Sequence, residues 1–247
     1  MEQTTRFRSA EPPREASLPK RFYEGVEVVA GDGVHSIQLD GRPVRTPGRN
    51  LLATPNAATA AAIAGEWDAQ RSHIDPRTMP ATRLANTALD GVAGEIQGVQ
   101  EDVVRYAGSD LTCYRADGPV ALVEREAVAW DPYLDWARAK FGAHFVLSEG
   151  VMHVTQPPQT INAISGVVGQ VRDPFQLAAL HVMTSLTGSA LIALAVLQGQ
   201  VDVETAWANA HVDEDWNIEQ WGEDEEATAL RQQRGAEMRV AALFATS

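Results

Sequence analysis

A run of 23 residues without Asp, Glu, Lys or Arg, from Phe175 to Leu197, most constrains what this chain can fold into. It is long enough to span a bilayer, so it must lie either in a membrane or in a protein core. Polar and small residues cluster at its centre, between positions 181 and 189. No basic flank marks a cytoplasmic end, because Arg172 is followed at once by Asp173. The sequence therefore predicts a buried core helix or helix pair, and no membrane insertion.

The composition is that of a soluble globular protein. The 247 residues are 45% hydrophobic and 21% charged, which allows one large domain or two small ones with a sizeable core. The net charge of −13 argues against nucleic acid, whose phosphates demand a basic surface. A basic or apolar partner surface fits better. The single cysteine excludes an internal disulfide and any multi-cysteine zinc site.

Turn signals and periodicity divide the chain into three parts. Residues 1–19 are Pro-rich, mixed in charge and without an apolar h-region, so we expect a disordered lead-in that is not a secretory signal. Short β-rich runs between residues 22 and 53 are separated by Gly-Asp-Gly and Asp-Gly turns, which predicts a β-meander. The remainder is mostly helical. We therefore predict an α+β fold, with a small β-rich N-terminal domain over residues 20–90 and an α-helical C-terminal domain over residues 91–247.

Local signals also predict several boundaries. Thr54-Pro55 suits the N-cap and first position of an Ala-rich helix, and Asp131-Pro132 suits a second such start. The helix that opens at Asp131-Pro132 is expected to end at Gly142. The residues from 144 to 154 suggest a small hairpin that places His144 opposite His153.

Candidate catalytic residues are sparse. Cys113 is the only cysteine, and a nucleophilic cysteine needs a base in reach, usually histidine. The six histidines are scattered, and none follows at metal-ligand spacing. There is no dinucleotide fingerprint, P-loop or nucleophile elbow. We therefore expect no metal and no cofactor. A small hydrolase or transferase that uses Cys113 or a histidine stays as the alternative to a non-enzymatic role.

The most acidic part of the chain also contains large aromatic residues. Residues 213–226, the acidic segment, hold eight carboxylates, two tryptophans and no Lys or Arg. If a single helix runs through Gly222, a helical wheel predicts one mixed apolar and acidic stripe within about 40° of Trp207. The members of this stripe are His211, Glu214, Ile218, Trp221 and Glu225. Asp215, Glu219 and Glu223 fall on what looks like a solvated face, and Trp216 points the opposite way.

A carboxylate on such a stripe is costly unless it is paired. One interpretation is an internal salt bridge, with Arg231, Arg234 or Arg105 as the candidate partner. The other is an exposed surface on which tryptophan and glutamate together receive a partner, since aromatic anchors beside acids suit apolar and basic groups. The residues alone leave both interpretations open.

Several motifs taken together resemble the F1-ATPase assembly chaperone family that binds the α subunit. They are KRFYEGVEV, LDGRPVRTPGRNLL, IAGEWDAQ, IDPRTMPATRLANTALD, DLTCYRA, WDPYLDWARAKFG and DEDWNIEQWGEDEEA. The resemblance covers nearly the whole chain from residue 20. One departure is Gly108-Ser109-Asp110, where the family pattern leads us to expect a Glu-Thr-Asp-type triplet; Asp110 is kept.

The resemblance implies a chaperone without cofactor that holds the newly made α subunit until the β subunit replaces it. It implies a bacterial, cytoplasmic form here and a mitochondrial matrix location for eukaryotic relatives. The residues expected to meet the partner are Glu225, Glu219, Glu214, Asp213, Trp221 and Gly222. Those expected to be structural are Trp67, Trp207, Asp110 and Cys113, with Trp67 buried where the two domains meet.

Overall fold

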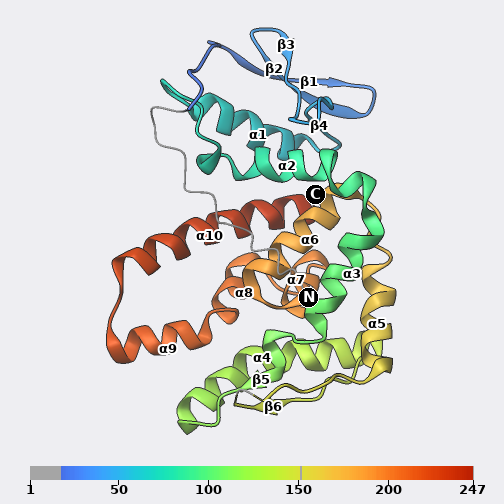
Figure 1. Cartoon of the computed structure of the whole chain (residues 1–247), viewed down its shortest axis with the longest axis vertical. Coiled ribbons are helices and arrows are strands. Elements are labelled where there is room, and N and C mark those ends of the chain that lie inside the picture. The colour runs from blue at the N-terminus through green and yellow to red at the C-terminus, as the bar shows by residue number, and fades with distance from the viewer. Residues whose placement is uncertain (1–17, 151, 247) are drawn as a thin grey trace, which may run out of the picture.

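The computed structural model describes residues 18–150 and 152–246. A small sheet and its covering helix lie at one end of the molecule, and the other helices form the rest (Figure 1). The predicted α+β class is therefore confirmed. The expected lead-in over residues 1–19 falls almost wholly outside the described residues. At its described end, the Pro19 carbonyl accepts a hydrogen bond from the Ile74 amide at 2.8 Å.

The predicted β-meander forms the sheet. Strands β1 (Val26–Gly31) and β2 (Val34–Leu39) pair antiparallel, and β2 also pairs with the two-residue strands β3 (Arg42–Pro43) and β4 (Ala53–Thr54). The turn between β1 and β2 has Asp32 at φ 51° and Gly33 at φ 77°. Two left-handed residues in a two-residue loop match the twist of a hairpin, which is why Asp-Gly predicted this turn.

Helix α1 (Ala57–Ala69) packs against β1 and β2, and its start differs from the predicted one. The N-cap is Asn56, whose side chain accepts a hydrogen bond from the Ala58 amide at 2.7 Å. Thr54 belongs to β4 instead, and its hydroxyl donates to the Asn56 carbonyl at 2.9 Å. Asparagine caps at least as well as threonine, and strand pairing keeps Thr54 extended.

The helical part is built around the uncharged stretch. That stretch forms α6 (Pro174–Thr187) and α7 (Ala190–Leu197), which confirms the predicted buried helix pair. Gly188 at φ 67° ends α6, and the Ser189 hydroxyl caps α7 by accepting from the Ile192 amide at 3.0 Å. Every helix within the described ranges is too short or too polar to cross a membrane.

Within the described residues, six further α-helices surround or continue from this pair, with 3₁₀ turns between some of them. They are α2 (Pro80–Asp90), α3 (Ile96–Ala107), α5 (Pro158–Val168), α8 (Val203–Asn209), α9 (Val212–Trp221) and α10 (Glu225–Ala245). The 3₁₀ turns are η2 (Pro76–Thr78), η3 (Val92–Gly94) and η4 (Leu111–Cys113). Helix α6 contacts α2, α3, α7 and α10, so the apolar pair lies at the centre of the helical part.

A seventh, α4 (Val120–Phe141), is one helix, so the predicted helix start at Asp131-Pro132 is wrong. Trp130 and Tyr133, on either side of Pro132, are both buried, so packing continues through this point of α4. The Asp131 carboxylate pairs with Arg115 at 2.7 Å and caps nothing. Pro132 is exposed, so water can replace the hydrogen bond that its missing N–H cannot make. The predicted end is confirmed, with Gly142 at φ 68°.

The hairpin expected between residues 144 and 154 does not form in the described part of that segment. Instead, β6 (Ser148–Glu149) pairs in parallel with β5 (Tyr114–Arg115), more than thirty positions earlier. His153 lies 3.2 Å from the Tyr114 hydroxyl through its Nδ1 atom. His144 is exposed and contributes its carbonyl to the Thr160 hydroxyl. The conformation of this region is therefore determined by pairing with a distant strand, which no local sequence pattern predicts.

Candidate functional site

The acidic segment lies on an antiparallel helical arm, residues 212–234, that extends away from the body (Figure 1). The arm consists of α9, a short turn and the outer half of α10. Gly222 ends α9 with φ 90° and ψ 171°, and the Asp224 carboxylate then caps α10 by accepting from the Ala227 amide at 2.8 Å. A φ in this region favours glycine, because a side chain there would be strained.

The single helix assumed for the helical wheel is therefore wrong. The chain breaks once between α8 and α9 and again at Gly222, so Glu225 is not on the face of Trp221. Glu225 instead opens α10 and is exposed. The part of the stripe within α9 does share one side of that helix: Glu214, Ile218 and Trp221 all line the same hollow.

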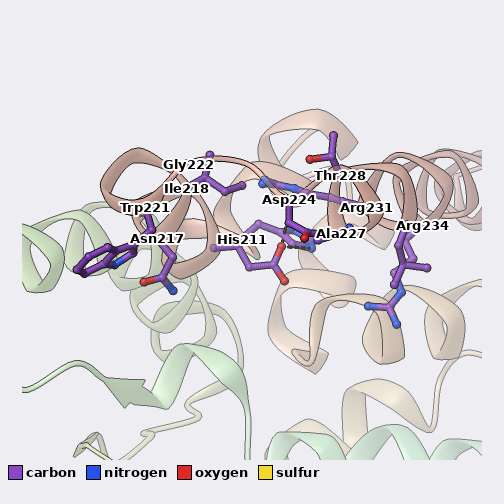
Figure 2. A pocket seen from close by; sticks show the side chains of 12 residues that line it. His211, Asn217, Ile218, Trp221, Gly222, Asp224, Ala227, Thr228, Arg231 and Arg234 are labelled. Atoms are coloured by element: carbon purple, nitrogen blue, oxygen red, sulfur yellow. Dashed lines mark hydrogen bonds and ion pairs between the residues drawn. The ribbon is translucent and has the colours of Figure 1, made fainter.

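This hollow, the groove, lies between α9 and α10 and has a volume of about 370 Å³. Helix α10 contributes Leu230, Arg231 and Arg234 to its lining. Figure 2 shows Trp221 at the end near the turn and Arg234 at the opposite end. Trp221 is 86% exposed, which is unusual for so large an apolar side chain.

Ion pairs join the two helices of the arm at the base of the groove. Arg231 makes a close pair with Asp215, and its Nε atom lies 4.0 Å from Glu214. The internal-pair interpretation therefore holds for Arg231, whereas Arg105 pairs with Asp102 instead. Because the Glu214 side chain is still 60% exposed, it also remains accessible to a partner.

A second set of contacts attaches the arm to α4. The Arg125 guanidinium pairs with Glu219 at 2.7 Å and lies 4.9 Å from the centre of the Trp216 ring. The hydrogen bond from Arg125 lowers the pKa of Glu219, which keeps this carboxylate charged. The face predicted to be merely solvated, with Asp215 and Glu219, is thus the face that holds α9 to its neighbours.

Asp213 takes part in the same attachment. It is exposed at the start of α9 and shares a hydrogen bond with Glu126, a buried residue of α4. Burial, followed by the hydrogen bond and the negative charge of Asp213, raises the pKa of Glu126 to about 7. The Ala116 amide donates to Glu126 at 2.9 Å and acts in the opposite direction.

Sequence reasoning missed Arg125, Glu126 and Trp130 as parts of this attachment. The buried Trp130 indole N–H donates to the Asn209 carbonyl at 2.7 Å, just before α9 begins. Glu126, Trp130 and Tyr133 recur at spacings of four and three, a buried helical stripe that could have been found from the pattern. Their partners lie about eighty or more positions later, and nothing local identifies them.

Asp110 is fully buried and binds two segments together. Its carboxylate accepts hydrogen bonds from the Thr112 amide and hydroxyl in η4, from the Ser189 hydroxyl at 2.7 Å, and from the Leu191 amide at 3.0 Å. Burial raises its pKa, while these donors act against that rise. Ser109 is exposed and Gly108 is half-buried, so the departure in the preceding two residues leaves the network unchanged.

Cys113 lies next to this network and is fully buried. Burial, with a smaller effect of the Asp110 charge, raises the pKa of its thiol to about 12. At neutral pH the sulfur is therefore protonated and shielded from solvent, the opposite of what a nucleophilic cysteine requires. Among the described residues, no group of three or more His, Cys, Asp or Glu side chains could hold a metal ion.

The two tryptophans expected to be structural are both half-buried, so the prediction that Trp67 is buried is wrong. Trp67 contacts Tyr23 edge-on at 5.7 Å between ring centres, and the Tyr23 hydroxyl donates to the Trp67 carbonyl at 2.6 Å. Its contact with Tyr23 places it against the N-terminal part. Trp207 lies against the His211 ring, with 3.9 Å between the ring centres, and His211 in turn lines the groove. A Cβ at Gly235 would lie 3.4 Å from the Trp207 Nε1 atom, an ordinary van der Waals distance, so α10 packs closely on this ring.

Solved structures of other proteins share this fold. A solved structure from Agrobacterium tumefaciens, described as a putative chaperone, matches with a TM-score of 0.87 and 50% identity. The match covers 93% of this chain and 86% of that one. The protein is therefore a chaperone by class.

More closely defined relatives give the family. The family model described as ATP12 chaperone protein matches residues 20–138. The solved Atp12 of Paracoccus denitrificans is 41% identical with a TM-score of 0.82, covering 93% of this chain and 99% of that one. Protein atp12, mitochondrial, of Schizosaccharomyces pombe is 24% identical over 220 residues, 84% of this chain and 75% of that protein. The chain belongs to the ATP12 chaperone family, which confirms the resemblance to F1-ATPase assembly chaperones.

Proposed function

We propose that this protein binds the unassembled α subunit of the F1 part of ATP synthase and prevents its aggregation until the β subunit replaces it. Family membership supports a role in F1 assembly. The observation that carries the proposal is the arm, where Trp221 is 86% exposed directly beside the eight carboxylates of residues 213–226.

The physical logic follows from what an unassembled subunit exposes. Surface that is destined for burial between subunits is apolar in part, and such patches aggregate. A chaperone for that surface needs an apolar contact and charges that fix the register of binding. It must also release its client, so its affinity must be moderate compared with that of the final partner.

The partner-binding residues expected from the sequence divide into three roles in this proposal. Trp221, Glu225 and the outer side of Glu214 contact the client, because all three are exposed on the arm. Gly222 sets the turn between the helices. Asp213 and Glu219 hold the arm against α4, and they act on the client through the position of the arm.

The proposal includes a non-enzymatic role in the bacterial cytoplasm. Among the relatives, the Schizosaccharomyces pombe protein is described as mitochondrial. The protonated, fully buried Cys113 thiol weighs against the hydrolase or transferase alternative. The hydrolase or transferase alternative predicts a substrate-dependent burst of product that thiol-blocking reagents abolish, and this can be measured directly.

Co-expression tests the proposed function directly. The α subunit from the same organism is expressed alone, with this protein, or with a variant in which Glu225 is changed to Lys. We expect soluble α and a complex on size exclusion only with the wild-type chaperone. Unchanged soluble α and no complex with the wild type would show that α is not the client.

A further inference from the structure

We infer that the groove binds its client as an amphipathic helix with an apolar face and basic residues at one end, so that a third helix completes the arm. The inference rests on the proposed function, because the helix belongs to the α subunit. Three observations carry it: the chemistry of the groove walls, the pairing of the backbone around them, and the distribution of charge along the groove.

The walls offer an apolar strip on which to lay a helix. Ile218 and Trp221 project from α9, and Leu230, 46% exposed, projects from α10. The inner end is closed by His211, which is buried against Trp207. An apolar side chain placed in this strip therefore loses contact with water and is stabilised in proportion to the area buried.

The backbone around the groove favours a helix over an extended segment. Both walls are α-helices, whose interior N–H and C=O groups are already paired within the helix. An extended segment buried between them would find no backbone partners for its own polar groups, and each unpaired group is costly. A helix satisfies its backbone internally, and laying one into a groove between helices is a recurrent mode of recognition.

Charge along the groove gives the occupant a direction. Four consecutive acids, residues 223–226, are exposed at the turn. Arg234 lies at the end of the groove opposite Trp221 (Figure 2). At the base of the groove, the charge of Arg231 is already neutralised by its ion pair with Asp215. The client therefore needs no charged residue at this point. Basic residues are therefore favoured over the turn and disfavoured near Arg234.

The dimensions limit the length of the occupant. Helix α9 has ten residues, so the wall is about 15 Å long and matches a helix of about three turns. We therefore expect apolar residues at spacings of three and four on the client segment, with Lys or Arg clustered beyond one end.

The test uses the full-length chaperone with purified α subunit and with synthetic peptides that tile the α sequence. Ile218→Asp and Leu230→Asp each place a carboxylate in the groove. Val120→Asp is the matched control, because Val120 is 73% exposed on α4 and lies outside the groove. We expect the two groove variants to weaken α binding by about tenfold or more, the range of interface hot spots, and the control to bind as the wild type does.

Leu230→Asp keeps the test sound if Ile218→Asp disturbs α9, since Leu230 is already partly in solvent. A peptide bound in the groove should also change the fluorescence of Trp221, measured as the difference from a Trp221→Phe variant, and should gain helical circular dichroism. Normal α binding by Leu230→Asp, or peptides that bind without gaining helix, would overturn the inference and leave the proposed function standing. Failure of the wild type to bind α would instead remove the proposed function itself.

Discussion

Arg125 of α4 and Glu219 of α9 form an ion pair at 2.7 Å, and the same guanidinium stacks on Trp216 at 4.9 Å. The two residues are 94 positions apart, so the pair joins the arm to the helical body. A single exposed ion pair stabilises a fold only weakly, and so does the cation–π contact beside it. This is enough to bias the orientation of the arm without deciding the stability of the fold.

Reversing this pair provides the first prediction. Arg125→Glu should leave the melting temperature nearly unchanged, increase hydrogen exchange in α9, and weaken α binding. The double variant Arg125→Glu with Glu219→Arg should recover part of both effects, because the ion pair is rebuilt with opposite signs. Exchange and binding that are identical in the single and double variants would mean that the pair does not position the arm.

The second prediction concerns Glu225 at the start of α10. Glu225→Lys should abolish α binding while the protein stays folded, because the side chain is exposed and loses only a helix-dipole contribution of about 0.3–1 kcal/mol. Co-purification with α reports binding, and a thermal melt reports the fold. Glu226→Lys is the control, since Glu226 has the same exposure and the same place in the first turn. Equal loss with both variants would indicate a general effect of charge rather than a specific contact.

The third prediction concerns Trp67. Trp67→Arg should lower the free energy of unfolding by about 2–4 kcal/mol and give insoluble or loosely packed protein, because a charge replaces a ring packed on Tyr23. The same substitution at the exposed Trp221 should leave the melt unchanged. A cooperative, wild-type melt for Trp67→Arg would contradict a structural role for this side chain.

The fourth prediction is a pH dependence that arises from Glu126. Its pKa of about 7 lies above the ordinary value near 4.3, so the folded state binds the extra proton. This contribution is fully present below about pH 4.3 and is lost as the pH rises through about 7. Asp213 and Arg115 are the charged groups that act on it, in opposite directions.

Glu126→Gln should therefore remove this fall in stability, since an amide stays neutral throughout. Melts recorded from pH 5 to pH 8 should show the variant gaining relative to the wild type toward pH 8. Parallel curves for the two proteins would mean that Glu126 does not titrate in this window.

The fifth prediction concerns Cys113. Cys113→Ala or Cys113→Ser should keep protection of α from aggregation, at a cost of about 1–2 kcal/mol from lost packing or a buried hydroxyl. Light scattering of α and a chemical melt measure the two quantities. Loss of protection in a variant that melts normally would revive a chemical role for the thiol.

Patterns that act over a few residues were predictable from the sequence. The Asp-Gly turn at 32–33, the end of α4 at Gly142 and the buried pair α6–α7 all follow from local backbone preference or from the absence of charge. The conformation of a hairpin turn or a helix end depends mainly on the residues that form it, so both can be predicted from the sequence alone. The acidic and aromatic character of the arm was equally visible.

Only the tertiary structure determined which of these acidic and aromatic residues pair within the protein and which are exposed. In the structure, Tyr114 pairs in parallel with Ser148, and α4 is continuous through Pro132. The assumed single helix ends at Gly222, so Glu225 does not share a helix face with Trp221. The tertiary structure also separated the acids that contact Arg125, Arg231 and Glu126 from those that are exposed at the turn. Each outcome depends on a partner distant in the chain, and the free energy of such a contact is realised only when packing brings both sides together.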